Sequence, residues 1–303
     1  MQLTVAICTY GRPTEAVRLV SECLEQMGED ELVLIDQSAP WDARQLAEGL
    51  PSDSRIQWRQ LSRRGLPSAR NAALDIARHP VLVFFDDDVH LDPGCLEGFR
   101  DRFSDTSVAG ASGRIVEARV ASNSPRLVNR IGLDGRVRYN LDAADAGPIE
   151  SLKGCNMAFR TDLLRRVGGF DPQYGGTAFL EDADASERIV KAGGQLWFEP
   201  RASVFHASHP TAGVRSSDRV YDWWRFHNTA RFMHQHRSLP ARWTAEVTFR
   251  VLAMRLAAYR GDPGFAGVLM RAWREGADSA RTCRAAGGRR TTGASLEHTY
   301  GSR

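Results

Sequence analysis

Three consecutive aspartates, Asp86, Asp87 and Asp88, directly follow the apolar run Val81–Phe85. Carboxylates this close together repel one another unless a cation neutralises them. Residues two apart on an extended chain point the same way, so we expect Asp86 and Asp88 to converge and Asp87 to point elsewhere. Oxygen ligands in small number suit Mg²⁺ or Mn²⁺ that is shared with a phosphate group. The triplet therefore predicts a metal–phosphate site, and an acidic strand-to-loop turn is the alternative.

Short apolar runs alternate with amphipathic stretches before and around this triplet. Strands are predicted at Leu3–Cys8, Glu31–Asp36, Arg55–Leu61, Val81–Phe85 and Val108–Glu117, with helices opened by Pro13 and Pro67. Strands separated by helices indicate right-handed βαβ crossovers and a mainly parallel sheet, so the predicted fold class is α/β. Ligands of such sheets bind at the carboxyl ends of the strands, where Asp36 and the aspartate triplet stand.

The composition excludes several classes of protein. The 303 residues are 42% hydrophobic and 25% charged, which is typical of a globular chain and not of a disordered or collagen-like one. No run reaches the ~18 apolar residues of a membrane span, and the N-terminus lacks a secretory pattern, so we expect a cytoplasmic protein. Five cysteines without CxxC spacing argue against a zinc site or a disulfide framework.

Charge is unevenly distributed along the chain. Residues 214–303 contain 16 Arg and 7 acidic residues, whereas the other 213 carry 24 basic and 30 acidic ones. Helices are predicted at 219–236, 240–259 and 263–281. In the second, Trp243, Val247, Val251 and Met254 form one stripe among arginines. We expect these helices to pack on the rest of the chain; peripheral attachment to an anionic membrane is the alternative. No nucleic-acid-binding motif accompanies the charge.

Six segments occur in the order found in family 2 glycosyltransferases, which the sequence resembles over roughly residues 1–236. They are VAICTYGRP, LVLIDQS, RGLPSARNAAL, VLVFFDDDV, KGCNMAFRTDLLRRVGGFD and EDADASERIVKAGGQLWFEPRASVFH. The resemblance implies a GT-A fold and inverting transfer of a sugar from a nucleotide diphosphate to an acceptor hydroxyl. We expect a catalytic domain at 1–213, divided near 117 into a nucleotide-binding half and an acceptor half. A basic helical extension at 214–283 and a flexible tail at 284–303 would follow.

The resemblance also implies roles for single residues. Residues of the donor pocket are Thr9, Tyr10, Arg12, Asp36, Arg64, Arg70, Asp86, Asp87, Gly154 and Asn156. Asp36 resembles the carboxylate that accepts the imide N–H of the base, which favours a UDP- or dTDP-sugar. The metal ligands are Asp88, Asp86 and His206, and His209 is close enough to replace the last. The bound Mg²⁺ or Mn²⁺ would neutralise the departing diphosphate. Alternative roles are a turn cap for Asp36, a surface position for Arg70 and a structural role for His206.

Asp182 resembles the general base that takes the proton of the acceptor hydroxyl. A carboxylate in the first turn of a helix is stabilised as the anion. In the alternative, Glu181, Asp182 and Asp184 all serve as helix-capping acids. Because Asp184 would point about 200° away from Asp182 around the helix, only one of these two aspartates should face the site.

Other function classes fit less well. A sugar nucleotidyltransferase would bring a glycine- and lysine-rich phosphate loop near the first strand, whereas CTYGRP has one glycine and no lysine. A dinucleotide dehydrogenase would need a GxGxxG motif after a strand, and none is present. A non-catalytic sugar-nucleotide-binding protein would not need Asp86, Asp88 and Asp182 together.

Overall fold

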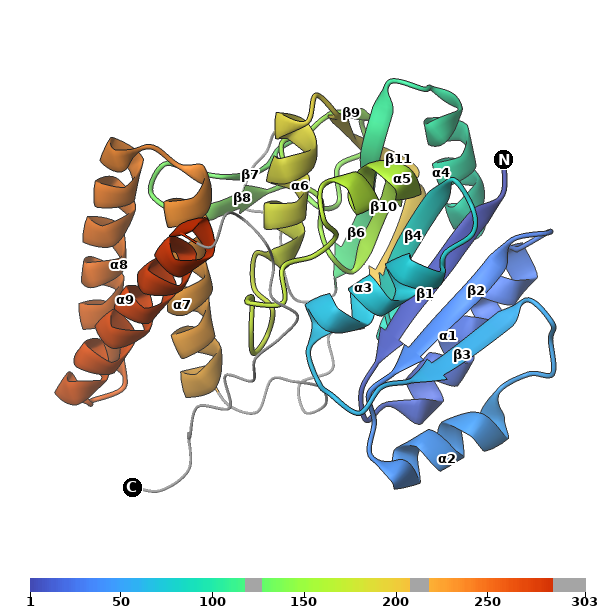
Figure 1. The fold of residues 1–303 in the computed structure, drawn as a ribbon, viewed down its shortest axis with the longest axis horizontal. Helices are drawn as coiled ribbons and strands as arrows, with labels where there is room; N and C mark the ends of the chain where they lie inside the picture. The colour runs from blue at the N-terminus through green and yellow to red at the C-terminus, as the bar shows by residue number, and fades with distance from the viewer. Residues whose placement is uncertain (118–126, 208–217, 286–303) are drawn as a thin grey trace.

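The computed structural model describes residues 1–117, 127–207 and 218–285 and contains a central sheet with helices on both faces (Figure 1). The strands that share one direction are β1 (Leu3–Thr9), β2 (Glu31–Asp36), β3 (Ile56–Gln60), β4 (Val81–Asp86), β6 (Val108–Glu117) and β11 (Gln195–His206). Between β4 and β6 lies the antiparallel strand β10 (Asn156–Arg160). The short strands β5 (Val89–Leu91) and β9 (Gly147–Pro148) pair antiparallel with β11.

The strand order is β3-β2-β1-β4-β10-β6-β11-β5, which confirms the predicted α/β class with a mainly parallel sheet. Strands from both predicted halves of the catalytic part enter this one sheet. A separate two-stranded sheet is formed by β7 (Asn129–Ile131) and β8 (Val137–Tyr139), which follow β6 along the chain. Every residue of β2 is buried, as expected for a parallel strand that is covered on both faces.

Two apolar clusters fill the space between the sheet and its helices. One face is covered by α1 (Pro13–Gln26), with α2 (Pro40–Gly49) beside it, and by α4 (Cys95–Ser104). The other face is covered by α3 (Leu66–Ile76), α5 (Thr161–Arg166) and α6 (Glu181–Lys191). Proline stands in the first turn of α1, α2 and α3, where its missing N–H leaves no hydrogen bond unmade. The helices that carry the candidate site residues are thus packed firmly on the sheet.

The three predicted C-terminal helices are present as α7 (Asp218–His236), α8 (Leu239–Tyr259) and α9 (Pro263–Ala285). They share a third apolar cluster with Tyr174, Leu180 and Ala183 of the sheet-bearing part. Arg231 of α7, fully buried, forms an ion pair of 2.6 Å with Asp171. No helix of the described ranges is both long and apolar enough to span a membrane. His209 lies outside the described residues, as do residues 286–303 of the predicted tail 284–303. The first two residues of that predicted tail belong instead to α9.

Candidate active site

Five strands end at one edge of the sheet, and each ends in a polar or ionisable residue that could bind a ligand. Thr9, Asp36, Asp86, Glu117 and His206 are the last residues of β1, β2, β4, β6 and β11. Register pairs Thr9 with Asp36 and Glu117 with His206 across parallel strands. Because these strands share one direction, four of the residues predicted from the sequence lie along the same edge, at the position where α/β sheets bind ligands.

The aspartate triplet turns back towards β1. Thr9 Oγ1 donates a hydrogen bond of 2.7 Å to Asp87, and Arg12 Nη1 donates to Asp87 at 2.7 Å and to Asp88 at 2.8 Å. The expectation that Asp87 points away from its neighbours is therefore wrong in part, because it shares Arg12 with Asp88. The strand ends at Asp86 and the next two residues form a turn, so the alternation of an extended chain no longer applies there.

Burial and charge act in opposite ways on the two buried aspartates. Burial raises the pKa of Asp87 to about 6, although Arg12 and Thr9 oppose the shift. Burial also acts to raise the pKa of Asp88, but the hydrogen bond from His206 and the charges of His206 and Arg12 outweigh it and lower that pKa to about 2. Asp88 is therefore the carboxylate of the pair that stays ionised throughout the physiological range.

His206 lies between two carboxylates. Its Nε2 donates to Asp88 Oδ1 at 3.1 Å and its Nδ1 donates to Glu117 Oε1 at 2.8 Å. Burial acts to lower the pKa of His206, but these two hydrogen bonds and the nearby negative charges raise it to about 10. Glu117 thus holds the ring through Nδ1, while Nε2 faces Asp88.

Asp36 is fully buried at the end of β2. Its Oδ1 accepts a hydrogen bond of 2.8 Å from the backbone N–H of Ser38. Its Oδ2 is buried and has no hydrogen-bond partner among the described residues. A buried acceptor without a partner is costly, so this oxygen is poised to receive a donor. Tyr10 directly follows the neighbouring strand β1. The guanidinium carbon of Arg64 lies 4.3 Å from the centroid of the Tyr10 ring.

Arg70 is buried on α3, which contradicts the surface position considered for it. Its Nη2 donates to Asp86 Oδ1 at 3.0 Å and to the carbonyl of Gly154 at 2.9 Å. Its guanidinium also forms an ion pair with Glu181 in the first turn of α6. One arginine therefore connects the end of β4, the segment before β10 and the start of α6.

Asp182 and Asp184 differ in their surroundings, as the helical geometry predicts. Asp182 is half-buried, and its Oδ2 accepts a hydrogen bond of 2.8 Å from the backbone N–H of Gly154. Asp184 is buried, and its oxygens lie 2.7 Å from Arg188 Nη2 and 2.7 Å from His236 Nε2. Asp184 is thus a structural carboxylate, and Asp182 is the one next to Gly154 and Arg70.

The backbone before α6 takes an unusual course. Ala178 and Leu180 have φ values of 54° and 69°, in the left-handed region that residues other than glycine rarely adopt. Such conformations cost free energy and persist only where surrounding packing fixes them. Both side chains are buried, and Leu180 directly precedes α6. This course sets where the helix begins and so where Asp182 points.

Asn156 begins β10 beside Phe85 of β4, but its side chain is engaged within the sheet. It is fully buried, and its Nδ2 donates to the carbonyl oxygens of Arg114 at 3.0 Å and Ala202 at 2.8 Å. Its amide therefore joins β6 to β11, because Gly113 of β6 has no side chain to fill the space: a Cβ there would be 2.3 Å from Asn156 Nδ2. We infer that Asn156 holds these strands together.

Two further residues at the site were not predicted. Glu117 holds His206, but nothing in the sequence indicates that β6 and β11 are neighbours. Lys153 lies next to Gly154, and although burial acts to lower its pKa, the charge of Asp182 and more weakly that of Asp86 raise it. A signal for Lys153 was available, since it is one of only two lysines in a chain whose other basic residues are arginines.

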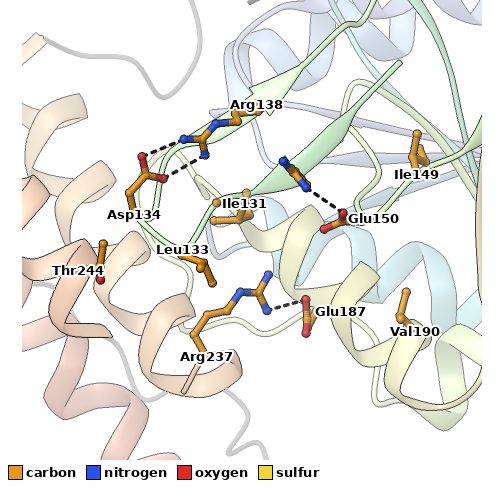
Figure 2. A pocket seen from close by; sticks show the side chains of 12 residues that line it. Ile131, Leu133, Asp134, Arg138, Ile149, Glu150, Glu187, Val190, Arg237 and Thr244 are labelled. Atoms are coloured by element: carbon orange, nitrogen blue, oxygen red, sulfur yellow. Dashed lines mark hydrogen bonds and ion pairs between the residues drawn. The ribbon is translucent and has the colours of Figure 1, made fainter. Parts of the chain in front are cut away.

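A cavity of about 790 Å³ lies elsewhere, between the β7–β8 hairpin, α6 and the start of α8 (Figure 2). None of the residues predicted for donor, metal or base is among those that line it. Its arginines are locally neutralised by the ion pairs Arg138–Asp134 at 3.0 Å, Arg130–Glu150 at 3.6 Å and Arg237–Glu187 at 2.9 Å. The carboxyl edge of the sheet is therefore the better candidate for the chemistry.

The family model described as Glycosyl transferase family 2 matches residues 4–168, which is more than half of the chain. The chain belongs to this family. Pre-mycofactocin glycosyltransferase of Mycobacterium tuberculosis is 30% identical to it over 148 residues, 47% of this chain and 30% of that protein. N-acetylglucosaminyl-diphospho-decaprenol L-rhamnosyltransferase of the same species is 33% identical over 93 residues, 26% of this chain and 30% of that protein. The family 2 chain thus matches less than a third of the length of each relative.

Solved structures share the fold of this family 2 chain. The crystal structure of GalNAc-T7 with UDP, GalNAc and Mn²⁺ matches with a TM-score of 0.57 at 16% identity, covering 85% of this chain and 57% of that one. S. aureus TarS matches with a TM-score of 0.52 at 14% identity, covering 88% and 44%. The predicted GT-A fold with C-terminal helices is confirmed.

Proposed function

We propose that this glycosyltransferase moves a sugar from a UDP- or dTDP-sugar to an acceptor hydroxyl, with inversion at the anomeric carbon and Asp182 as the general base. The observation that carries the proposal is the link through Gly154 and Arg70. The N–H of Gly154 bonds Asp182, its carbonyl bonds Arg70, and Arg70 bonds Asp86 at the end of β4. A single network thus fixes the proposed base relative to the edge where the diphosphate would lie.

The buried Oδ2 of Asp36 supports the choice of uracil or thymine as the nucleobase of the donor. Uracil and thymine each present one imide N–H, and Asp36 Oδ2 is a buried acceptor without a partner among the described residues. Pairing the two would satisfy a group that is otherwise costly to bury. Thr9 ends the neighbouring strand β1, and Tyr10 and Arg12 follow it. The guanidinium of Arg64 stacks on the Tyr10 ring. These four side chains would surround the nucleotide.

The residues beside this pocket fit a divalent metal. Asp88 and His206 already face one another at 3.1 Å, and Asp86 keeps 34% of its side chain exposed. The described ranges contain no group of three or more His, Cys, Asp or Glu side chains that could hold a metal ion by themselves, so the ion would need ligands from the donor as well. Mg²⁺ and Mn²⁺ take few protein ligands at phosphate sites and complete their shell with phosphate and water. Bound there, the ion would supply Lewis-acid stabilisation of the leaving diphosphate.

Asp182 would act as the general base. As the acceptor oxygen attacks the anomeric carbon, its proton would pass to Asp182 while the bond to the diphosphate oxygen breaks with its electron pair. The Gly154 N–H fixes Oδ2, and Asp182 lies in the first turn of α6, near the charge of the Lys153 ammonium. These residues orient the proposed general base.

A thermal-shift panel of UDP-, dTDP- and GDP-sugars with and without Mn²⁺ tests the donor part of this proposal. We expect a UDP- or dTDP-sugar to raise Tm in the presence of Mn²⁺, and Asp88→Ala to lose the metal-dependent part of the shift. A response to GDP-sugars alone would contradict the role of Asp36. No response to any nucleotide would contradict the proposal as a whole.

A further inference from the structure

Helix α8 is apolar on both faces, which is unusual for a helix at the edge of a molecule. On its inward face, which packs against α7 and α9, the buried residues are Ala241, Ala245, Phe249, Ala253 and Ala257, with Leu252 and Leu256 partly buried against the same cluster. A helix with a single buried face normally carries polar residues on the other. The inward alanines allow close approach of the helices, and several larger apolar side chains of α8 lie outside this contact.

Those larger side chains form the outer face of α8, which comprises Leu239, Trp243, Val247, Val251, Met254 and Tyr259. Trp243 is 68% exposed, Val247 61% and Met254 59%. Half of the twelve large hydrophobic residues exposed in the described ranges lie on this one helix. Single exposed hydrophobic residues are common, but a contiguous run of them marks an interaction surface. The stripe expected from the sequence is therefore real, and it is the face that α7 and α9 leave uncovered.

The charges beside the outer face are mainly positive. Arg242, Arg250 and Arg255 belong to the same helix, against the single acid Glu246, which pairs with Arg250 at 2.7 Å. Trp243 and Tyr259 stand towards the two ends of the face. Amphipathic aromatic rings favour the boundary between water and lipid, and arginines favour anionic headgroups.

We propose that the outer face of α8 docks on the surface of an anionic phospholipid bilayer, with the helix lying in the plane of the interface. A second copy of the chain fits this face less well. Two-fold contact through it would bring the arginine flank of one copy beside that of the other, and like charges repel. α8 lies at the far end of the molecule from α2 and β3, so docking leaves the nucleotide-binding part exposed to water (Figure 1).

Co-sedimentation with phosphatidylcholine vesicles, with and without phosphatidylglycerol, tests this proposal. We expect the full chain to bind the vesicles that contain phosphatidylglycerol, and to bind them less as salt screens the arginines. Replacing Trp243 and Val247 together by Glu should weaken binding about tenfold or more, since each side chain loses its apolar burial. Trp41→Glu is the matched control: this tryptophan is 69% exposed on α2 and should leave binding unchanged.

A second variant separates charge from apolar contact. Arg250→Ala with Arg255→Ala should reduce binding to anionic vesicles while leaving the apolar residues in place. Wild-type protein that binds neither kind of vesicle would overturn the proposal, as would equal binding by wild type and the Trp243→Glu/Val247→Glu variant. Light scattering that shows a dimer dissociated by this variant, without vesicle binding, would assign the face to a second copy instead. Vesicle binding does not depend on sugar transfer, so its outcome is independent of the proposed activity.

Discussion

The backbone N–H of Gly154 donates a hydrogen bond of 2.8 Å to Oδ2 of Asp182, and this contact sets the geometry of the proposed base. Gly154 is closely surrounded: a Cβ built on it would lie 3.0 Å from Arg70 Nη2 and 3.3 Å from Asp182 Oδ2. Both neighbours would have to move by a few tenths of an ångström to admit a methyl group. The residue is therefore a small spacer between the base and its supporting arginine.

We expect Gly154→Ala to lower kcat about tenfold while the donor KM changes little, because small displacements of a catalytic group are costly. Steady-state kinetics with the donor identified by thermal shift would measure both constants. Gly267→Ala on α9 is a suitable control, since a Cβ there would meet nothing within 4 Å. An unchanged kcat in Gly154→Ala would show that the tight contact does not position the base.

Asp36→Asn tests the assignment of the nucleotide base. The amide of asparagine can offer an N–H where the carboxylate offered an acceptor, so it would oppose the imide N–H of uracil or thymine. We expect affinity for the UDP- or dTDP-sugar to fall at least about tenfold, a loss comparable to one hydrogen bond to a charged group. Calorimetric titration of donor into both proteins would measure this. Equal affinities would assign Asp36 to the turn that it caps through Ser38.

The buried pair of Arg231 and Asp171 attaches the C-terminal helices to the part of the chain that contains the sheet. Their side chains are 0% and 2% exposed, and the joining nitrogen and oxygen are 2.6 Å apart. Arg231→Met leaves Asp171 charged and buried, so we expect the free energy of unfolding to fall by about 3–5 kcal/mol in urea denaturation. Arg219→Met, which breaks the exposed pair with Asp262, should cost at most about 1 kcal/mol. Similar losses in the two variants would contradict this account.

We expect burial of His227 to lower the stability of the folded protein at acidic pH. Burial, and then the nearby charge of Arg231, lowers its pKa from the ordinary 6.5 to about 4. As pH falls below 6.5 the unfolded chain binds the proton first, so stability is lost between about pH 6.5 and pH 4, by up to about 3 kcal/mol. His227→Phe keeps a ring beside Trp223 and should flatten the dependence of Tm on pH in this window. Parallel Tm–pH curves for the two proteins would rule out His227 as a source of the loss.

Local sequence pattern predicts those parts of the fold that depend on neighbouring residues. The buried runs that became β1, β2 and β4, and the helices opened by Pro13 and Pro67, follow from apolar periodicity and helix-start chemistry. Asp36 and the aspartate triplet lie at the sheet edge because strand ends in a parallel sheet share an edge. The alternation argument failed for Asp87 because it assumed an extended chain through a residue that lies in a turn.

The local sequence pattern could not predict contacts between residues that are far apart in the sequence. Glu117 meets His206, 89 residues later in the sequence, only because β6 and β11 are neighbours in the sheet. Asn156 is buried because β10 enters the sheet between β4 and β6. The burial of Arg70 likewise depends on Glu181, which is distant in sequence. Strand order and the packing of α6 decide these contacts, and both are properties of the whole fold.

The most direct test of the central claim is the rate of nucleoside diphosphate release in Asp182→Asn, measured with the donor that stabilises the wild-type protein. Loss of a general base should lower this rate about 10²- to 10⁴-fold while donor affinity stays the same. Asp162→Asn, whose side chain is 89% exposed on α5, should retain the wild-type rate. Release at the wild-type rate by Asp182→Asn would contradict the assignment of Asp182 as the base.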